Sequence, residues 1–369
     1  MSALFSTPAD DMPLIELQQV GMRFGLRPPP GPLARAWRRL VPAAPAPVTR
    51  AVDGVDLTVA PGEVVGLVGE SGCGKSTLGR IAAGLLQPTE GHVLSQGQAL
   101  EALDASQRMA ARLRVQMVFQ DPFGSLNPRL RIDRIVGEAA RHHGLIAPGT
   151  GAAGLDDYVC AQLQRAGLDP ALWHRYPHQF SGGQRQRIGI ARALAVQPRM
   201  LVCDEAVAAL DVSIQAQILN LFMALREELG LAYLFISHDL GVIEHLCDRV
   251  LVMYLGRVVE SAPVEALFSG AAHPYTQALL AEIPRLDQRR ARFSAIRGEI
   301  PSPLNPPGGC HFHPRCPQAM PRCRVEAPQL RGIAIHHQVA CHLHGAAPAP
   351  HTPPSSAAPL NSTSTHVSP

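Results

Sequence analysis

A glycine-rich segment between two apolar runs constrains the fold of this chain more than any other feature. The segment Gly69–Ser76 reads G-E-S-G-C-G-K-S and fits the phosphate-loop pattern G-x4-G-K-[ST]. The apolar run Val64–Val68 precedes it, and residues 77–86 follow it with apolar side chains at the spacing of one helix face. Strand, glycine loop and helix in this order predict an α/β domain in which loop amides and the helix N-terminus bind phosphate. A glycine-rich turn before an ordinary helix is the alternative, and the flanking strand and helix argue against it.

The segment also contains Lys75, which is the only lysine among the 33 Lys and Arg residues of the chain. An ammonium is a compact point charge, whereas a guanidinium is a broad planar fork, so a tight phosphate cradle accommodates only the first. We therefore expect Lys75 to contact the β- and γ-phosphates of ATP and Ser76 to ligate Mg²⁺. The other residues of this predicted nucleotide site are Gly69, Glu70, Ser71, Gly72, Cys73, Gly74 and Thr77.

Length and composition place the chain among globular proteins. Its 369 residues favour two domains, and a hydrophobic fraction of 46% is enough for a core. The net charge of +3 argues against a dedicated nucleic-acid binder, and no apolar stretch approaches the roughly 20 residues that span a bilayer. Residues 1–11 include two acidic residues and no basic ones, unlike a signal peptide, so we expect the chain on the cytoplasmic side.

Residues 55–260 alternate strand-like and helical patterns, which is typical of a doubly wound α/β domain. One strand-like run, residues 200–204, ends in the adjacent acids Asp204 and Glu205. Ligands bind at the carboxyl ends of strands in such sheets, and adjacent acids there are costly unless a cation compensates them. The functional interpretation assigns Asp204 to Mg²⁺ and Glu205 to the general base that activates water. A solvated strand end is the alternative.

A second motif resembles a known family. Residues 179–194 read Q-F-S-G-G-Q-R-Q-R-I-G-I-A-R-A-L and resemble the signature motif of ATP-binding cassette (ABC) ATPases. A serine at a helix start followed by glycines offers a hydroxyl and free amides to an anion. In the family that anion is the γ-phosphate held by the opposite subunit, so the resemblance implies a second ATPase subunit, with a heterodimer expected. The residues concerned are Ser181, Gly182, Gly183 and Gln184.

Other residues take their expected roles from the same resemblance. Gln120 resembles the Q-loop glutamine, which senses Mg²⁺ and water, and His238 resembles the switch histidine that contacts the γ-phosphate. Asp211 lies in the segment that corresponds to the D-loop. Phe24 is the candidate for the aromatic ring that stacks on adenine, with packing in the core as the alternative.

The chain departs from the family pattern at two positions. The family usually has proline and serine where this chain has Ala206 and Ala209. Loss of the D-loop hydroxyl removes one hydrogen bond across the dimer, worth about 1 kcal/mol. We expect activity to survive this loss.

The C-terminal part narrows the resemblance. Residues 273–280, 301–310 and 312–317 resemble the C-terminal extension of oligopeptide/dipeptide importer ATPases, and residues 120–129 resemble their F-type member. This resemblance implies an ATP-hydrolysing subunit on the cytoplasmic face of the plasma membrane, with two transmembrane permease subunits and, indirectly, an extracytoplasmic solute-binding protein. Peptide is the expected substrate, with nickel, opines or sugars as alternatives. A soluble ABC ATPase acting on nucleic acid or ribosomes, and a non-hydrolysing structural subunit, are the competing interpretations.

Four of the eight cysteines fall in this extension with the spacing C-x5-C-x6-C-x17-C. Disulfides are disfavoured in the cytosol, and four thiolates suit Zn²⁺ or a [4Fe–4S] cluster. Related peptide importers carry an iron–sulfur cluster here, so the resemblance favours the cluster over zinc and over free thiols. The four are Cys310, Cys316, Cys323 and Cys341.

The expected domain organisation follows from these patterns. The Pro-rich insert contains Arg35, Arg38 and Arg39, which we expect in a solvated loop, with contact to anionic lipid as the alternative. The expected segments are a disordered N-terminus (1–13), an ABC nucleotide-binding domain (14–260) with a Pro-rich insert (27–48) and a helical subdomain (about 121–195), the C-terminal extension (261–345) and a disordered tail (346–369).

Overall fold

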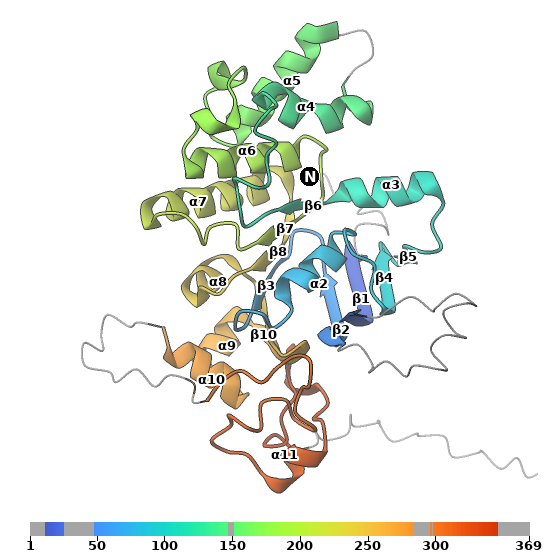
Figure 1. Ribbon diagram of the computed structural model, residues 1–369, viewed down its shortest axis with the longest axis vertical. Coiled ribbons are helices and arrows are strands. Elements are labelled where there is room, and N and C mark those ends of the chain that lie inside the picture. Colours follow the sequence, from blue (N-terminus) through green and yellow to red (C-terminus); the bar gives the residue numbers. More distant parts are fainter. Residues whose placement is uncertain (1–11, 26–47, 147–150, 284–295, 297, 346–369) are drawn as a thin grey trace, which may run out of the picture.

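The computed structural model describes residues 12–25, 48–146, 151–283, 296 and 298–345. Residues 1–11, the expected tail and nearly all of the Pro-rich insert, including Arg35, Arg38 and Arg39, lie outside these residues. Within the described part, the strands form one eight-stranded and one four-stranded sheet, and helices surround them (Figure 1). The fold is thus the mixed α/β arrangement that the alternating sequence pattern predicts.

The larger sheet has the strand order β11-β12-β10-β9-β3-β8-β7-β6. Strands β9, β3, β8, β7 and β6 are parallel, so their carboxyl ends meet at one edge. The strands are β3 (Val64–Val68), β6 (Val115–Val118), β7 (Met200–Asp204), β8 (Ala232–Ile236), β9 (Arg249–Tyr254), β10 (Arg257–Pro263), β11 (Arg331–Ala334) and β12 (His337–Val339).

The smaller sheet is antiparallel, with the order β2-β1-β4-β5. Its strands are β1 (Ile15–Phe24), β2 (Thr49–Val59), β4 (Glu90–Ser95) and β5 (Gln98–Ala99). Helix α2 (Lys75–Ala82) lies between the two sheets, where Leu78 packs with Leu17 of β1 and Leu234 of β8. On the other face of the larger sheet, Phe235 packs against Phe222 of α7 (Val212–Leu229). Burial on both faces explains why β8 is apolar at every position.

A third core lies away from the sheets. Helices α4 (Ile132–His142), α5 (Gly151–Arg165) and α6 (Gly182–Leu194) pack around it with fully buried Val136, Val159 and Ile188. Figure 1 shows these helices at the opposite end of the molecule from α11 (Pro321–Val325). The remaining helical elements are α3 (Ala105–Arg114), η1 (Pro170–Leu172), η2 (Pro177–Gln179), α8 (Leu240–Leu246), α9 (Val264–Gly270) and α10 (Pro274–Ala281).

The C-terminal extension shares the core of the nucleotide-binding domain. Its strand β12 pairs with β10, so the expected boundary between residues 260 and 261 falls inside a strand. Phe312, which is 1% exposed, packs against Tyr254 of β9 and Tyr275 of α10 with ring centroids 5.3 Å away in both cases. A loop-rich segment without periodicity is therefore ordered by a sheet and a core that earlier residues build.

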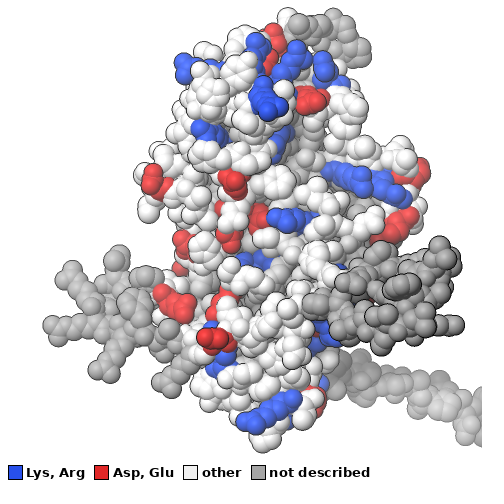
Figure 2. Space-filling model, viewed as in Figure 1, with Lys and Arg blue, Asp and Glu red and all other residues white. Residues whose placement is uncertain are grey.

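The described surface carries both signs of charge. Figure 2 shows basic side chains interspersed with acidic ones over the visible face. Among the described helices, none has both the length and the apolar character that a membrane span requires.

Candidate nucleotide-binding site

The glycine loop joins β3 to α2 and can be built only with glycine at two positions. Gly74 has a φ of 109°, and a Cβ there would lie 2.0 Å from the carbonyl oxygen of Ala51 in β2. Gly69 has a φ of 150°, and its Cβ would lie 2.1 Å from the carbonyl oxygen of Met253 in β9. Gly74 is the N-cap of α2 and supplies no side-chain hydrogen bond. The first amides of α2 therefore remain available to an anion.

The Lys75 side chain lies across this loop and is 5% exposed. Its Nζ donates to the carbonyl oxygens of Gly69 at 2.7 Å and Glu70 at 3.0 Å, and lies 4.0 Å from Sγ of Cys73. Burial raises the pKa of the Cys73 thiol, so this side chain is a neutral part of the core. The lone lysine thus puts a buried point charge at the centre of the phosphate loop.

The loop borders a cavity of about 250 Å³. The glycine loop, strand β2, the carboxyl edge of the larger sheet and the C-terminal extension all contribute to its wall, so residues from five parts of the sequence meet there. It is lined by Thr49, Ala51, Ser71, Gly72, Gly74, Lys75, Ser76, Thr77, Gln120, Glu205 and Pro303.

Two oxygen-bearing side chains lie side by side next to this cavity. Ser76 Oγ donates to Asp204 Oδ1 at 2.7 Å, although the two residues come from α2 and the end of β7. Asp204 is 3% exposed, and burial raises the pKa of its carboxyl group. A divalent cation would offset that cost, and a hydroxyl with a carboxylate is a donor set that Mg²⁺ accepts. The residues present therefore fit the predicted magnesium site.

The three residues predicted to handle water and the γ-phosphate meet at the same edge. Gln120 Nε2 donates to Glu205 Oε2 at 2.7 Å, and His238 Nδ1 lies 3.7 Å from Glu205 Oε1. Glu205 has a φ of 47°, an uncommon backbone conformation for a residue with a side chain. Its N–H donates to the carbonyl oxygen of Ile236, at the end of β8, at 3.0 Å, and this bond holds the strained turn that follows β7. The carboxylate is thus directed at the cavity instead of continuing the strand.

The signature residues lie outside the phosphate-loop cavity. Ser181 is the N-cap of α6, with Gln184 N–H donating to its Oγ at 3.4 Å and Gln184 Oε1 accepting from Ser181 N–H at 3.0 Å. A Cβ at Gly183 would lie 2.5 Å from Cγ2 of Ile214 in α7, so this glycine also permits close helix packing. Asp211 is the N-cap of α7. One chain therefore presents a phosphate loop and a signature at separate places.

Phe24 ends β1 and is 41% exposed, so the alternative of core packing is wrong. Its partner in the strand register is Thr49, which lines the cavity. Adenine stacking stays a prediction.

The four C-terminal cysteines gather as thiols. Burial, together with the smaller effects of the neighbouring Cys323, Cys341 and Cys316, raises the pKa of Cys310 to about 11. The Cys310 N–H donates to the Cys323 carbonyl oxygen at 2.8 Å. Across the described residues, however, no three His, Cys, Asp or Glu side chains are arranged to hold a metal ion. The expected cluster therefore has no support from the geometry.

Sequence reasoning missed the residues that approach the phosphate loop from the C-terminal extension. Pro303 lines the cavity, the hydroxyl of Tyr275 accepts from the Glu70 N–H at 2.8 Å, and Arg315 pairs with the Glu70 carboxylate at 2.7 Å. These residues lie more than 200 positions from the loop in sequence, with separations of 205 for Tyr275 and 245 for Arg315. No local pattern could have associated them with it.

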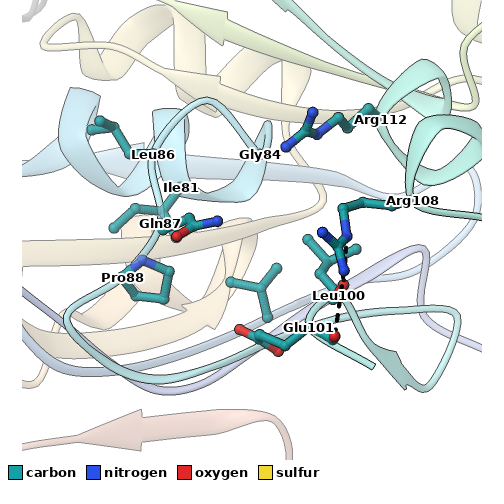
Figure 3. A pocket seen from close by; sticks show the side chains of 10 residues that line it. Ile81, Gly84, Leu86, Gln87, Pro88, Leu100, Glu101, Arg108 and Arg112 are labelled. Carbon is teal, nitrogen blue, oxygen red and sulfur yellow. Dashed lines mark hydrogen bonds between the residues drawn. The ribbon is translucent and has the colours of Figure 1, made fainter. Parts of the chain in front are cut away.

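A further cavity, of about 190 Å³, lies at the C-terminal end of α2. Arg108 and Arg112 of α3 reach toward it, and Arg108 Nε donates to the Leu100 carbonyl oxygen at 3.2 Å (Figure 3). None of the predicted nucleotide-site residues lines it, so it is separate from the phosphate loop at the other end of the helix.

Comparisons with known proteins agree with this geometry. The family described as "ABC transporter" matches residues 52–208, and the family described as "Oligopeptide/dipeptide transporter, C-terminal region" matches residues 259–323. The probable peptide ABC transporter ATP-binding protein y4tS of Sinorhizobium fredii is 51% identical over 315 residues, which cover 85% of this chain and 88% of that protein. The oligopeptide transport ATP-binding protein OppF of Escherichia coli is 47% identical over 300 residues, covering 80% and 89%.

A solved structure supports the same assignment. The dimeric structure of MJ0796, a bacterial ABC transporter cassette, has a TM-score of 0.57 and 27% sequence identity, and the match covers 68% of this chain and 98% of that one. A post-hydrolysis state of the same cassette bound to ADP and Pi gives a TM-score of 0.56. This chain belongs to the ATP-binding proteins of the ABC transporter family, in the group that carries the oligopeptide/dipeptide transporter C-terminal region.

Proposed function

We propose that this chain is the ATP-hydrolysing subunit of an importer for peptides, seated on the cytoplasmic face of the plasma membrane. The observation that carries the proposal is the convergence of Gln120, Glu205 and His238 at the mouth of the phosphate-loop cavity. The relatives named for oligopeptide transport, and the C-terminal region shared with them, support peptide as the substrate. No feature of the described residues favours a soluble ABC ATPase that acts on nucleic acid or ribosomes.

The residues divide the work of hydrolysis. Lys75 and the amides of the phosphate loop bind the β- and γ-phosphates, and Ser76, Asp204 and Gln120 would hold Mg²⁺, which neutralises phosphate charge when bound. Glu205 takes a proton from water, whose oxygen bonds to the γ-phosphorus while the bond to the β–γ bridging oxygen breaks. ADP and inorganic phosphate are the products, and positioning with electrostatic stabilisation supplies most of the rate.

We further propose that catalysis needs a second ATPase subunit, in a heterodimer. The support for a dimer is the separation of the two half-sites, because Ser181 and its glycines do not line the cavity beside the phosphate loop. The resemblance to the importer ATPases favours a different chain as the partner. Each loop would then be completed by the signature of the partner. The purified chain alone should accordingly be a weak ATPase whose activity depends on concentration.

We propose that the membrane permease subunits bind a different surface of the chain from the one that binds the second ATPase subunit. A cavity of about 550 Å³ lies between the end of α2 and helices α4 and α6, with Leu85, Phe119 and Arg192 in its wall. Leu85 is 55% exposed. Phe123, four residues after Phe119 in the sequence, is 61% exposed and has Arg185 stacked 3.9 Å from its ring centroid. Exposed apolar residues around a cavity are typical of an interaction site. The adjacent Gln120 would link this surface to the nucleotide.

The test uses the assembled transporter in lipid vesicles. We expect its ATPase rate to rise when binding protein loaded with peptide is added outside, and labelled peptide to accumulate inside. A Lys75→Ala transporter serves as the control without hydrolysis. Full, concentration-independent activity of the isolated chain, or indifference to loaded binding protein, would contradict the proposal.

The resemblance also implies a [4Fe–4S] cluster in the C-terminal extension, and we propose this cluster separately. Its ligands would be Cys310, Cys316, Cys323 and Cys341. Its support is the match of residues 259–323 to the C-terminal region of this group of proteins, and not the geometry of the described residues. Anaerobic purification followed by iron and acid-labile sulfide assays tests it. About four irons and four sulfides per chain are expected for such a cluster, whereas stoichiometric zinc or no metal would exclude it.

A further inference from the structure

Glu70, the second residue of the phosphate loop, is held through three different groups. Its carbonyl oxygen accepts from Lys75 Nζ at 3.0 Å, and its N–H donates to the hydroxyl of Tyr275 at 2.8 Å. Its carboxylate accepts from both terminal nitrogens of Arg315, at 2.7 and 2.9 Å. Two of these three partners belong to the C-terminal part of the chain and not to the P-loop domain that precedes it.

The pair of Arg315 and Glu70 is well sheltered from solvent. The Arg315 side chain is 5% exposed and that of Glu70 is 20% exposed. Arg315 also donates to the Tyr254 hydroxyl at 3.4 Å and stacks 5.9 Å from the centroid of that ring. A bidentate guanidinium–carboxylate pair fixes the orientation of the carboxylate as well as its distance, whereas a lysine in the same place would fix only the distance. The contact therefore sets where the start of the phosphate loop lies.

The extension reaches the nucleotide cavity at a second, independent point. Pro303 lines the cavity, and its carbonyl oxygen accepts from the Arg50 N–H of β2 at 3.4 Å. The extension thus contacts both the loop that would hold the phosphates and strand β2, whose residues Thr49 and Ala51 also line the cavity.

We propose that Arg315 is a positioning residue for nucleotide binding, through which the C-terminal extension holds the phosphate loop in its binding conformation. The guanidinium also neutralises the charge of a carboxylate that belongs to the phosphate loop itself. Nucleotide affinity is therefore a property of the loop and the extension together. The inference rests on the proposed role of the phosphate loop in binding ATP.

The test measures binding of MgATP and MgADP to the purified full-length chain by isothermal titration calorimetry. Replacing Arg315 with Ala should weaken both by about tenfold, because a charged hydrogen-bonded pair is lost and its carboxylate is left unpaired. Arg315→Lys keeps the charge but cannot make the bidentate pair, and it should lower both affinities by about threefold. In the assembled transporter the KM for ATP should rise while kcat changes little.

The matched control lies in the same extension. Arg322 and Glu326 also form a bidentate pair, with hydrogen bonds of 2.6 and 2.7 Å. Their side chains are 56% and 48% exposed, however, and neither residue lines the nucleotide cavity. Arg322→Ala should leave both affinities unchanged. Melting temperatures without nucleotide show whether each variant is folded, and if Arg315→Ala is not, Arg315→Lys carries the test.

A double substitution tests whether Arg315 affects nucleotide affinity through its contact with Glu70. In the Arg315→Ala background, Glu70→Gln should cause no further loss of affinity, because it removes the charge that Arg315 neutralised. The inference would be overturned if the two substitutions gave additive losses of nucleotide affinity. It would also be overturned if folded Arg315 variants bound MgATP and MgADP as tightly as the wild type. Those results leave the proposed function intact if the wild type binds MgATP and Lys75→Ala does not, whereas a wild type that fails to bind would refute the function itself.

Discussion

The exchange of Lys75 for arginine tests the chemistry of the phosphate loop most directly. Lys75 is 5% exposed, and its ammonium lies between two carbonyl oxygens at 2.7 and 3.0 Å, with a sulfur at 4.0 Å. A guanidinium keeps the positive charge but is longer and wider than this space. Overpacking a well-filled site costs about 1–3 kcal/mol, which corresponds to roughly a five- to 150-fold loss of ATP affinity.

The assay is titration of full-length Lys75→Arg with MgATP, followed by the ATPase rate of the assembled transporter. We expect hydrolysis to fall further than binding, because the same charge stabilises the transferred phosphoryl group. The control is Arg165→Lys, an exchange of the same two residue types at an exposed position, where Arg165 pairs with Glu228 at 3.3 Å. This variant should bind MgATP as tightly as the wild type. Near-normal hydrolysis by Lys75→Arg would refute the argument that shape, and not only charge, selects lysine here.

The other predictions concern catalysis and the buried link to the extension. Glu205→Gln should bind ATP but hydrolyse it at least about a hundredfold more slowly, and should prolong ATP-dependent association with the partner subunit in single-turnover experiments. Glu260 is fully buried and accepts from the Ala272 N–H at 2.7 Å, from the His273 N–H at 2.9 Å and from Nε2 of His337 at 2.8 Å. Glu260→Ala leaves these donors unpaired and should lower the free energy of unfolding by about 3–5 kcal/mol in urea titrations; a loss below 1 kcal/mol would contradict this. Burial lowers the pKa of His273 to about 4, and the Tyr275 N–H donates to its Nδ1 at 3.0 Å. The unfolded chain therefore binds more protons, and stability should fall as the pH drops from about 6.5 to 4, by at most about 3 kcal/mol; a His273→Gln variant should lose this slope.

Much of the nucleotide site could be predicted because its residues belong to short local patterns. The glycine loop between a strand and a helix predicts where phosphate binds, and the structure shows why Gly69 and Gly74 have no substitutes. The acids after a buried strand predict a cation-binding edge, and Ser76 indeed meets Asp204 there. Local patterns carry this information because a parallel sheet brings all its strand ends to one edge.

The partners of those residues could not be read in the same way. Nothing in the run that contains Glu70 indicates that its carboxylate has a guanidinium partner 245 residues away. The loop-rich segment after residue 300 has little periodicity, and its Phe312 completes a cluster with Tyr254 and Tyr275, which earlier elements supply. Such contacts depend on how the chain packs, because sequence patterns report only neighbours within a few residues.

The sequence by itself therefore determined the chemistry of this protein: a phosphate loop with a single lysine, a pair of acids at a strand end, and a signature helix that begins at a serine. Tertiary structure decided how that chemistry is supported. It strained the backbone at Glu205 so that the carboxylate faces the cavity, and it joined the C-terminal extension to the sheet through β12 and to the phosphate loop through Arg315. The reason is physical. Periodicity and spacing record the local preferences of the backbone, whereas pairing between distant segments follows from the burial and charge that only the folded chain brings together.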